Sequence, residues 1–408
     1  MPPRRSRFDT RTIFFFIAFG LATINIWYAS RAIKLGGPDP FLNAMQHQMK
    51  AAGGGKNQTA TGMGMGMGMG YAKEEQSSRP RHNYNFTIGI CAIVKDGEAY
   101  MTEWIDYHLD AMNIENIYIY DNSFESDLQT WYRNTRSHPL YKRVEVVHWR
   151  NETSGRQRGA YADCVMRFGK NVHEMGIQHS QQNGWNATDR ILNETDGMDY
   201  LAMIDIDEFL VPKGNYTSVH GVIKDYLEPY LGGSLTVNWM LFGSANKTIY
   251  SPIPVTKRFQ YRDELPNGVV KSIVQASDFY SMRNPHAANT LYGYTRTTSF
   301  KGATLGNEKG SSDPSVPSGT LLLYHYRYTS HKEYFFKKCV RMETDGMKGC
   351  SYKTGKVITR KELEAKGMPT HIAMRTGTVF DDSAWKLLTE RVPKYRIYDD
   401  DQAWGDYT

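Results

Sequence analysis

The 408-residue sequence has few cysteines, and none of them are spaced as in a zinc ribbon. Its four cysteines are Cys91, Cys164, Cys339 and Cys350, and the absence of a C-x-x-C pair argues against a structural zinc site. Cys339 and Cys350 flank a short glycine-containing loop, so their spacing suits a local disulfide bond in an oxidising compartment. Cys91 lies in an apolar run and Cys164 in a helical pattern, and we expect both to be buried free thiols.

A strong charge of one sign is also lacking. The chain has 49 Lys and Arg residues against 43 Asp and Glu, which gives a net charge of +6. No dense basic stretch occurs beyond the first eleven residues, and this distribution argues against nucleic-acid binding. A mildly basic enzyme would suit a negatively charged substrate such as a sugar nucleotide. Apolar residues make up 40% of the chain, which is enough for a large hydrophobic core.

Long hydrophobic runs are missing except for one near the N-terminus. Residues 13–29 carry no charge and have about the minimum length for spanning a bilayer. Four arginines precede this run and only Arg31 and Lys34 closely follow it, so the positive-inside rule predicts a cytosolic N-terminus. We expect a type II membrane protein with a cytosolic tail at 1–12 and a transmembrane signal-anchor at 13–30. A cleaved signal peptide is the alternative.

Seven N-x-Ser/Thr sequons support a lumenal location for the rest of the chain. They begin at Asn57, Asn85, Asn151, Asn186, Asn193, Asn215 and Asn246. Each is a weak motif by itself, but seven exceed what random placement of asparagine would usually produce. A short tail, an anchor and a stem together resemble Golgi enzymes, so we expect a Golgi membrane protein with a lumenal catalytic domain.

Residues 31–83 have the composition of a flexible stem. They include three consecutive glycines at 53–55 and an alternating Gly–Met repeat at 62–70. Glycine at every second position makes ordering costly in entropy. A copper-binding methionine tract is the alternative interpretation of the repeat. Beyond the stem we expect one catalytic domain at 84–400 and a C-terminal tail at 401–408.

From residue 84 onward, apolar runs alternate with helical patterns. Strands are predicted at 86–94, 117–120, 144–149 and 200–204, and apolar residues recur at helical spacing in 101–112 and 161–172. This alternation predicts an α/β domain with a mainly parallel central sheet. Ligands of such sheets bind beyond the carboxyl ends of the strands. The polar residues that follow the first, second and fourth strands should therefore meet.

The strongest candidate for chemistry is the acidic segment that follows the fourth strand. In an extended segment Asp205 and Asp207 point to one side, while Ile206 packs on the other. Two carboxylates at this spacing suit Mn²⁺ or Mg²⁺, and such a metal neutralises the charge of a departing nucleoside diphosphate. Solvated acids at a strand end are the simpler interpretation. A haloacid-dehalogenase-type phosphatase also uses two aspartates, but after the first strand of its domain.

Several short motifs between residues 86 and 340 resemble glycosyltransferase family 92, and a family-2-like group shares the first of them. In chain order they are Lys95–Glu98, Glu103–His108, Tyr118–Ser123, Ala160–Cys164, Ile204–Phe209, Trp239 with Phe242-Gly243, Lys271–Ile273, and His325-Tyr326 followed by Ser330 and Lys337. The order and spacing of the motifs are more specific than any single one. Asp96 stands where Asn is usual, and the segment 156–200 is long. The long segment leaves the identity of donor and acceptor open.

The resemblance implies a GT-A fold, Mn²⁺ dependence, inversion at the anomeric carbon, and transfer of a hexose, galactose being expected, from a UDP-sugar donor to a glycan acceptor. Carried over by position, Lys95 and Asp121 line the nucleotide pocket, and Asn122 and Ser123 support the same loop. Gln157, in the loop before the helix at 161–172, reaches the donor sugar. The alternative role for Asn122 and Ser123 is to cap the transition from strand to loop. The alternative for Gln157 is a surface position without a role in binding.

Two further roles remain to be assigned, a third metal ligand and a catalytic base. His325 ends a predicted strand at 321–324 and would complete a metal site with Asp205 and Asp207; a structural histidine is the alternative, and His286 is the competitor. Inverting transfer also needs a carboxylate to accept the proton of the acceptor hydroxyl.

Acidic residues downstream of the acidic segment supply the candidates for this base. Asp278 follows the apolar alternation at 269–276 and precedes two aromatics suited to stacking on a sugar ring. It is therefore our candidate, ahead of Glu264, which lies with Asp263 before a predicted turn. An inactive lumenal glycan-binding or scaffold protein of the same fold is the alternative to an enzyme.

Overall fold

The computed structural model describes residues 84–123, 128–149, 156–183, 197–230, 232–299, 301, 304–305, 313, 319–337 and 377–400. All of them belong to one compact unit, Asn57–Thr408. The predicted cytosolic tail, signal-anchor, stem and C-terminal tail lie outside the described residues. Within the described ranges, no helix combines the length and apolar character needed to cross a membrane.

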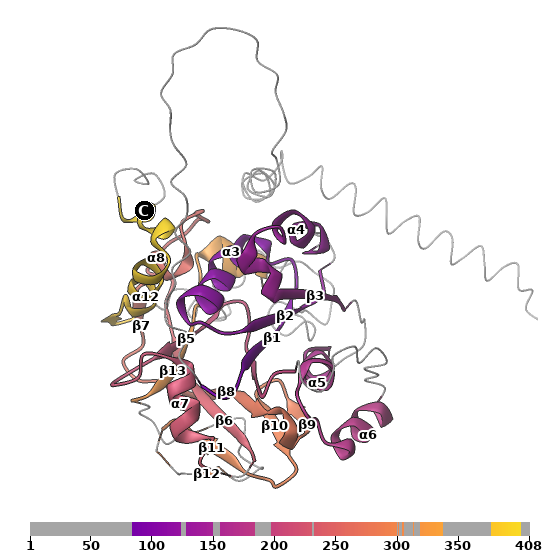
Figure 1. Cartoon of the computed structure of the whole chain (residues 1–408). Helices are drawn as coiled ribbons and strands as arrows, with labels where there is room; N and C mark the ends of the chain where they lie inside the picture. Colours follow the sequence, from indigo (N-terminus) through magenta and orange to yellow (C-terminus); the bar gives the residue numbers. More distant parts are fainter. Residues whose placement is uncertain are drawn as a thin grey trace, which may run out of the picture. The chain divides into compact units, whose positions relative to one another are not determined.

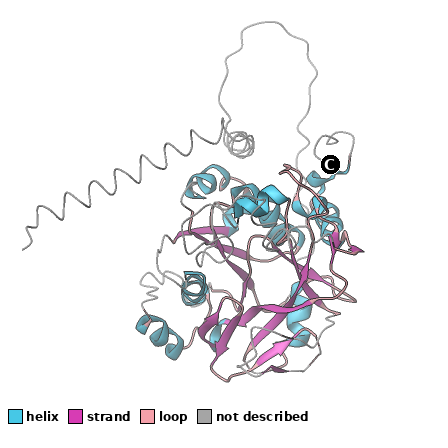
Figure 2. Cartoon of the chain, turned by 180° about the vertical axis from the view of Figure 1, so that it is seen from behind, coloured by secondary structure: helices cyan, strands magenta, loops and turns pink. Residues whose placement is uncertain are grey.

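A curled, mixed sheet of ten strands forms the centre of this unit, with helices flanking it (Figure 2). Its strand order is β12-β11-β6-β8-β4-β1-β2-β3, and β13 joins β6 to β5. Two small sheets pair β9 with β10 and β7 with β14. The strands are β1 (Ile88–Val94), β2 (Asn116–Asp121), β3 (Val144–His148), β4 (Tyr200–Met203), β5 (Glu208–Pro212), β6 (Ser234–Leu241), β7 (Tyr261–Arg262), β8 (Asn267–Gln275), β9 (Phe279–Asn284), β10 (Ala287–Thr290), β11 (Thr295–Thr297), β12 (Thr304–Leu305), β13 (Leu321–His325) and β14 (Val379–Phe380).

Helices lie on both faces of the sheet, and α3 and α5 flank the strands β1 to β3 from opposite sides (Figure 1). The predicted helix at 101–112 is α3 continued by a π-helical turn, η1, and the predicted helix at 161–172 begins and ends earlier, as α5. The helical segments are α3 (Glu98–Asp106), η1 (Tyr107–Ala111), α4 (Leu128–Thr135), η2 (Pro139–Arg143), α5 (Arg156–Phe168), α6 (Glu174–Gln182), α7 (Val219–Tyr226), α8 (Val255–Arg258), η3 (Ala276–Asp278), α9 (His331–Phe335), α12 (Ser383–Arg391) and η6 (Pro393–Asp399).

Strand β1 shows how the two cores on either face arise from one sequence. Its residues alternate between faces. Ile88 and Ile90 join a cluster that includes Trp104 of α3, whereas Cys91 and Ile93 join a second cluster with residues of α5. All seven residues of β1 are buried, as expected for a parallel strand covered on both faces. The apolar run of β1 is continuous because helices cover both faces of the sheet, so that every residue of the strand is buried.

Most pairings in the central sheet are parallel, as the sequence predicted. Strand β1 pairs in parallel with β2 and β4, β2 with β3, and β6 with β11 and β13. The antiparallel exceptions are β8, which pairs with both β4 and β6, and the edge pairs β13–β5 and β11–β12. Strands β1, β2, β3, β4, β6 and β13 consequently end at one edge of the sheet, where β5 and β8 begin. We call this the carboxyl edge.

Cys91 and Cys164 form a disulfide bond, so the expectation of two free thiols is wrong. Their Cα atoms are 6.2 Å apart and 73 residues apart in sequence. Cys91 lies on the face of β1 that α5 covers, and Cys164 is buried in the same cluster. No cysteine within the described ranges is free. The proposed Cys339–Cys350 pair lies outside them.

Candidate active site

The loops that follow β1, β2 and β3 are tied together at the carboxyl edge. The backbone N–H of Asp96 donates to Ser123 Oγ at 2.9 Å, and Ser123 N–H donates to Asp121 Oδ1 at 3.0 Å. Asn122 Nδ2 donates to the carbonyl oxygen of Trp149, just beyond β3, at 2.8 Å. Asp121, Asn122 and Ser123 are fully buried. Asn122 and Ser123 thus fix the loop that contains the buried Asp121, and Lys95, the predicted nucleotide-binding residue, follows the neighbouring strand β1.

The acidic segment between β4 and β5 is a turn, so its predicted extended conformation is wrong. The backbone N–H of Glu208 donates to the carbonyl oxygen of Asp205 at 3.0 Å, and this closes the turn. Ile206 packs against the core, as expected. A Cβ added at Gly97 would lie 3.3 Å from Ile206, so the loop after β1 approaches this turn closely. Because the chain turns here, the carboxylates of Asp205 and Asp207 have different partners.

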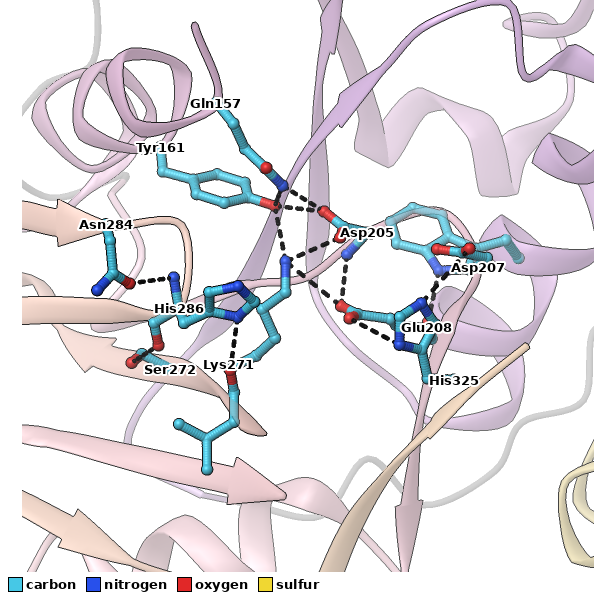
Figure 3. Close-up of polar contacts among 12 residues, drawn as sticks. Gln157, Tyr161, Asp205, Asp207, Glu208, Lys271, Ser272, Asn284, His286 and His325 are labelled. Carbon is cyan, nitrogen blue, oxygen red and sulfur yellow. Dashed lines mark hydrogen bonds and ion pairs between the residues drawn. The ribbon is translucent and has the colours of Figure 1, made fainter. Parts of the chain in front are cut away.

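Asp205 lies among donors from α5 and β8 (Figure 3). Its Oδ1 accepts hydrogen bonds from Gln157 Nε2 at 2.6 Å and from the Tyr161 hydroxyl at 2.8 Å. Its Oδ2 lies 3.0 Å from Lys271 Nζ. Burial would raise the pKa of the Asp205 carboxyl, but Lys271 and the hydrogen bonds lower it below its ordinary value. Gln157 lies within α5 rather than in a preceding loop.

Glu208, the first residue of β5, is the third carboxylate of the cluster. Its Oε2 accepts a hydrogen bond from the backbone N–H of Asp205 at 2.8 Å and lies 3.7 Å from Lys271 Nζ. Burial raises the pKa of Glu208 well above its usual value; Lys271 opposes this shift, and the charges of Asp205 and Asp207 add to it. Glu208 and Lys271 lie in two of the sequence motifs that resemble the family, but neither residue was assigned a role at the site from the sequence. A lysine within an apolar alternating run was the available signal for Lys271.

Asp207 faces the opposite way, toward β13 and α9. Its Oδ2 lies 3.5 Å from His325 Nε2 and contacts the ammonium group of Lys337. His325 is the last residue of β13 and pairs in register with Glu208. Burial would raise the pKa of Asp207, but Lys337 and His325 lower it well below its ordinary range. Asp207 is therefore ionised at neutral pH, beside a histidine nitrogen.

This arrangement fits a divalent cation only in part. No group of three or more His, Cys, Asp or Glu side chains in the described ranges is placed to hold a metal ion. Asp207 and His325 do converge, and an oxygen–nitrogen pair is acceptable to Mn²⁺. Both carboxylate oxygens of Asp205, by contrast, are already in contact with donors: Gln157 and Tyr161 at Oδ1, and Lys271 at Oδ2. Within the described ranges, Asp207 and His325 are thus the two side chains that could hold a divalent cation.

His286, the competitor of His325, lies apart from Asp207. The Trp239 ring lies between the two histidines, with its centre 4.4 Å from that of His325 and 5.3 Å from that of His286. His286 Nδ1 is 3.0 Å from the carbonyl oxygen of Val270. Burial and the charge of Lys271 lower the pKa of His286 to about 4. This histidine is therefore neutral and hydrogen-bonded to the backbone.

Asp278, the candidate base, is not brought to this site. Strand β8 runs antiparallel to β4, so Gln275 pairs with Tyr200, the first residue of β4, whereas Asp205 follows the last. Asp278 lies three residues beyond Gln275, at the opposite edge of the sheet. A Cβ added at Gly232 would lie 2.6 Å from Asp278 Oδ2, so a glycine turn covers this carboxylate closely.

The acidic pair Asp263 and Glu264 lies instead at the carboxyl edge. The backbone N–H of Asp263 donates to the carbonyl oxygen of Leu241 at 2.9 Å, and Leu241 pairs in register with His325. Neighbouring strands lie about 4.8 Å apart, so the backbone of Asp263 is roughly 10 Å from that of His325. Glu264 is exposed and Asp263 is half-buried.

An acidic, lysine-neutralised cluster at the carboxyl edge of a mixed α/β sheet is the site that the structure defines. Residues 84–358 match the family model of Glycosyltransferase family 92, a span that includes every residue of the site from Lys95 to Lys337. The chain belongs to glycosyltransferase family 92. A glycosyltransferase family 92 protein of Oryza sativa subsp. japonica is 22% identical over 239 residues, which cover 59% of this chain and 33% of the relative. The match thus spans a third of the relative's length.

Proposed function

We propose that the protein is a metal-dependent, inverting glycosyltransferase that transfers a hexose, galactose in the first instance, from a UDP-sugar to a glycan acceptor. One observation carries this proposal: in a family 92 chain, the Asp207–His325 pair lies at the same sheet edge as the loops that present Lys95 and Asp121. We also propose a GT-A type of fold, which the parallel strand order β3-β2-β1-β4 supports.

The nucleotide and the donor sugar take neighbouring positions along this edge in our proposal. Lys95 and Asp121 line the nucleotide pocket, where Asp121 accepts hydrogen bonds from the base or the ribose. Gln157 and Asp205, which are hydrogen-bonded to each other, face the donor sugar and the ribose. Lys271 offsets the effect of partial burial on the Asp205 carboxylate, because its ammonium supplies the nearest compensating charge.

Asp207 and His325 would hold Mn²⁺, or Mg²⁺ in its place. When bound there, the cation supplies charge neutralisation at the departing diphosphate. His325 is fixed for this role by its place at the end of β13 and by the Trp239 ring against it. Asp207 contributes a carboxylate that is already ionised, so no proton has to leave it before it binds a metal.

The catalytic base comes from the Asp263–Glu264 turn in this proposal, and no longer from Asp278. Single displacement with inversion needs a carboxylate on the acceptor side to take the hydroxyl proton. The turn lies beyond β6 on the side away from β5, next to the strand end that pairs with His325. A distance of about two strand spacings leaves room for a sugar between the metal pair and the base.

We propose the Golgi lumen as the location of the domain. The Cys91–Cys164 disulfide supports an oxidising compartment. The three sequon asparagines within the described ranges, Asn85, Asn215 and Asn246, are all exposed, as glycosylation requires. The basic residues before the apolar run at 13–29 support a type II orientation.

The test is a screen of UDP-sugar hydrolysis and transfer by the full-length protein, with Mn²⁺ against EDTA. An Asp207→Ala variant should fold normally and lose at least about 100-fold in metal-stimulated turnover. The matched control is Asp225→Ala, which removes an exposed aspartate of α7 and should leave turnover unchanged. Near-normal turnover by a folded Asp207→Ala protein at saturating Mn²⁺ would contradict the metal assignment. Absence of turnover with every nucleotide sugar would favour a glycan-binding or scaffold role instead.

A further inference from the structure

Lys337 and His325 converge on a single oxygen of Asp207. The Lys337 ammonium contacts Oδ2, and His325 Nε2 lies 3.5 Å from the same atom. A divalent cation bound to this oxygen would repel the Lys337 ammonium strongly in a partly buried site. A divalent cation held by Asp207 and His325 therefore competes with the Lys337 ammonium for the position that it occupies.

The helix that precedes Lys337, α9, is fixed in the core, whereas the long side chain of Lys337 can change its rotamer. Helix α9 begins with a capping box formed by Ser330 and Glu333. Glu333 accepts hydrogen bonds from both terminal nitrogens of Arg258 at 2.9 and 3.0 Å and from the Tyr100 hydroxyl at 2.7 Å. The side chains of Arg258 and Glu333 are 2% and 1% exposed. Lys337, two residues beyond α9, is 27% exposed and has four rotatable carbons.

We propose that Lys337 is an exchangeable counter-ion: it pairs with Asp207 in the metal-free protein and moves to the diphosphate of the donor once a divalent cation is bound. This inference rests on the proposed function. Asp207 needs one positive partner in each state because its side chain is only 15% exposed. A diphosphate that approaches a metal on Asp207 brings further negative charge, and a lysine ammonium binds phosphate as a compact point charge. The rotation of one side chain satisfies both requirements without movement of α9.

The exchange makes opposite predictions for two ligands. Without nucleotide, Lys337 opposes metal binding, so its removal should strengthen the binding of Mn²⁺. With metal bound, Lys337 binds the diphosphate, so its removal should weaken the binding of UDP. A lysine that only stabilises α9 or the folded protein would change neither affinity in this pattern.

The experiment compares full-length wild-type protein with Lys337→Met and with the control Lys332→Met, which replaces an exposed lysine of α9. Binding of Mn²⁺ alone, followed by electron paramagnetic resonance, should be about fivefold tighter for Lys337→Met. Binding of UDP at saturating Mn²⁺, followed by calorimetry, should be about tenfold weaker or more for Lys337→Met. The affinity for uridine should be the same in all three proteins, because uridine has no phosphate.

Each contrary result has a distinct meaning. Equal or weaker Mn²⁺ binding by Lys337→Met would overturn the exchange and leave the proposed glycosyltransferase standing. Unchanged UDP binding by Lys337→Met would overturn the transfer of the ammonium to the diphosphate. A wild-type protein that binds no Mn²⁺ would overturn both this inference and the proposed metal dependence. If Lys332→Met changed the affinities for Mn²⁺ and UDP as much as Lys337→Met does, the cause would be the net charge of the protein, and this result would also overturn the inference.

Discussion

Lys271 Nζ lies 3.0 Å from Asp205 Oδ2, and the lysine side chain is only 1% exposed. The same ammonium lies 3.7 Å from Glu208 Oε2 and 5.5 Å from the centre of the Tyr161 ring. Burial by itself would lower the pKa of Lys271, but the two carboxylates raise it well above its ordinary value. Lys271 is therefore a buried, fixed positive charge beside the carboxyl groups of Asp205 and Glu208.

Replacing Lys271 with methionine should destabilise the protein. The change leaves the Asp205 carboxylate, which is 30% exposed, without the ammonium that lies 3.0 Å from it, and loss of a hydrogen bond to a charged group costs about 1–3 kcal/mol. The control is Lys170→Met, because Lys170 pairs with Asp199 at 3.3 Å where the side chains are 34% and 27% exposed. That change should cost about 0–1 kcal/mol. Denaturant-induced unfolding measures both, and equal losses would show that Lys271 is not a buried counter-ion.

Asp278→Asn should retain glycosyl transfer within a few-fold, because Asp278 lies at the opposite edge of the sheet from Asp205. Of the variants Asp263→Asn and Glu264→Gln, one should lose at least about 100-fold in turnover, as expected for loss of a general base. Steady-state transfer with the sugar nucleotide found by the screen measures all three. If only Asp278→Asn lost about 100-fold in turnover, Asp278 would be the catalytic base after all.

The double variant Cys91→Ala/Cys164→Ala should lose about 2–5 kcal/mol of stability, since the disulfide closes a long loop of the unfolded chain. Denaturant-induced unfolding measures this loss. A reducing agent should lower the stability of the wild-type protein toward that of the double variant. Equal stability of the oxidised wild-type and the double variant would contradict the pairing.

Asp381 provides a prediction for the pH dependence of stability. Its Oδ2 accepts hydrogen bonds from Arg262 Nε at 2.7 Å and from the Tyr324 hydroxyl at 2.6 Å, and it lies 3.6 Å from Lys213 Nζ. Burial would raise the pKa of Asp381, but its hydrogen bonds and Lys213 lower it well below its ordinary value. The folded state thus binds this proton less readily than the unfolded state.

The stabilisation by Asp381 is accordingly present above the unfolded pKa of about 3.9 and is lost as the pH falls below it. Asp381→Asn should cost about 1–3 kcal/mol at pH 7, and the difference from wild-type should shrink as the pH is lowered toward 3. Urea unfolding at a series of pH values measures this. Asp382→Asn is the control, because Asp382 pairs with Lys386, a side chain that is 64% exposed. A difference that persists unchanged at acid pH would contradict the assignment.

Glycosylation tests the proposed topology. Glycosidase treatment of the cell-expressed protein should reduce its mass, and Asn85→Gln, Asn215→Gln or Asn246→Gln should each remove at most one glycan. Protease added outside sealed vesicles should spare the domain, because we place it in the lumen. Digestion of the domain in intact vesicles would contradict the type II orientation.

The sequence by itself determined the strands β1 to β4 and β13 and the edge at which the chemistry lies. The apolar run that became β1 is buried along its whole length, and the positions after β1, β2 and β4 meet because parallel strands end together. Local apolar periodicity encodes these features, since burial on one or both faces leaves a direct mark on residue order. The short motifs then sufficed to indicate the family, because their residue types and order follow the chain.

Only the tertiary structure decided which charges neutralise which. Lys337 and Asp207 are 130 residues apart, and Cys91 and Cys164 are 73 apart; no local pattern relates such pairs. The direction of β8 could not be predicted from the sequence either, because alternating apolar residues do not show whether a strand runs parallel or antiparallel to its neighbours. Its antiparallel course brings Lys271 to Asp205 and takes Asp278 to the opposite edge. The packing of the whole sheet sets which distant residues come together. It therefore decided which side chains contact the carboxylates, whereas the sequence showed only where those carboxylates lie along the chain.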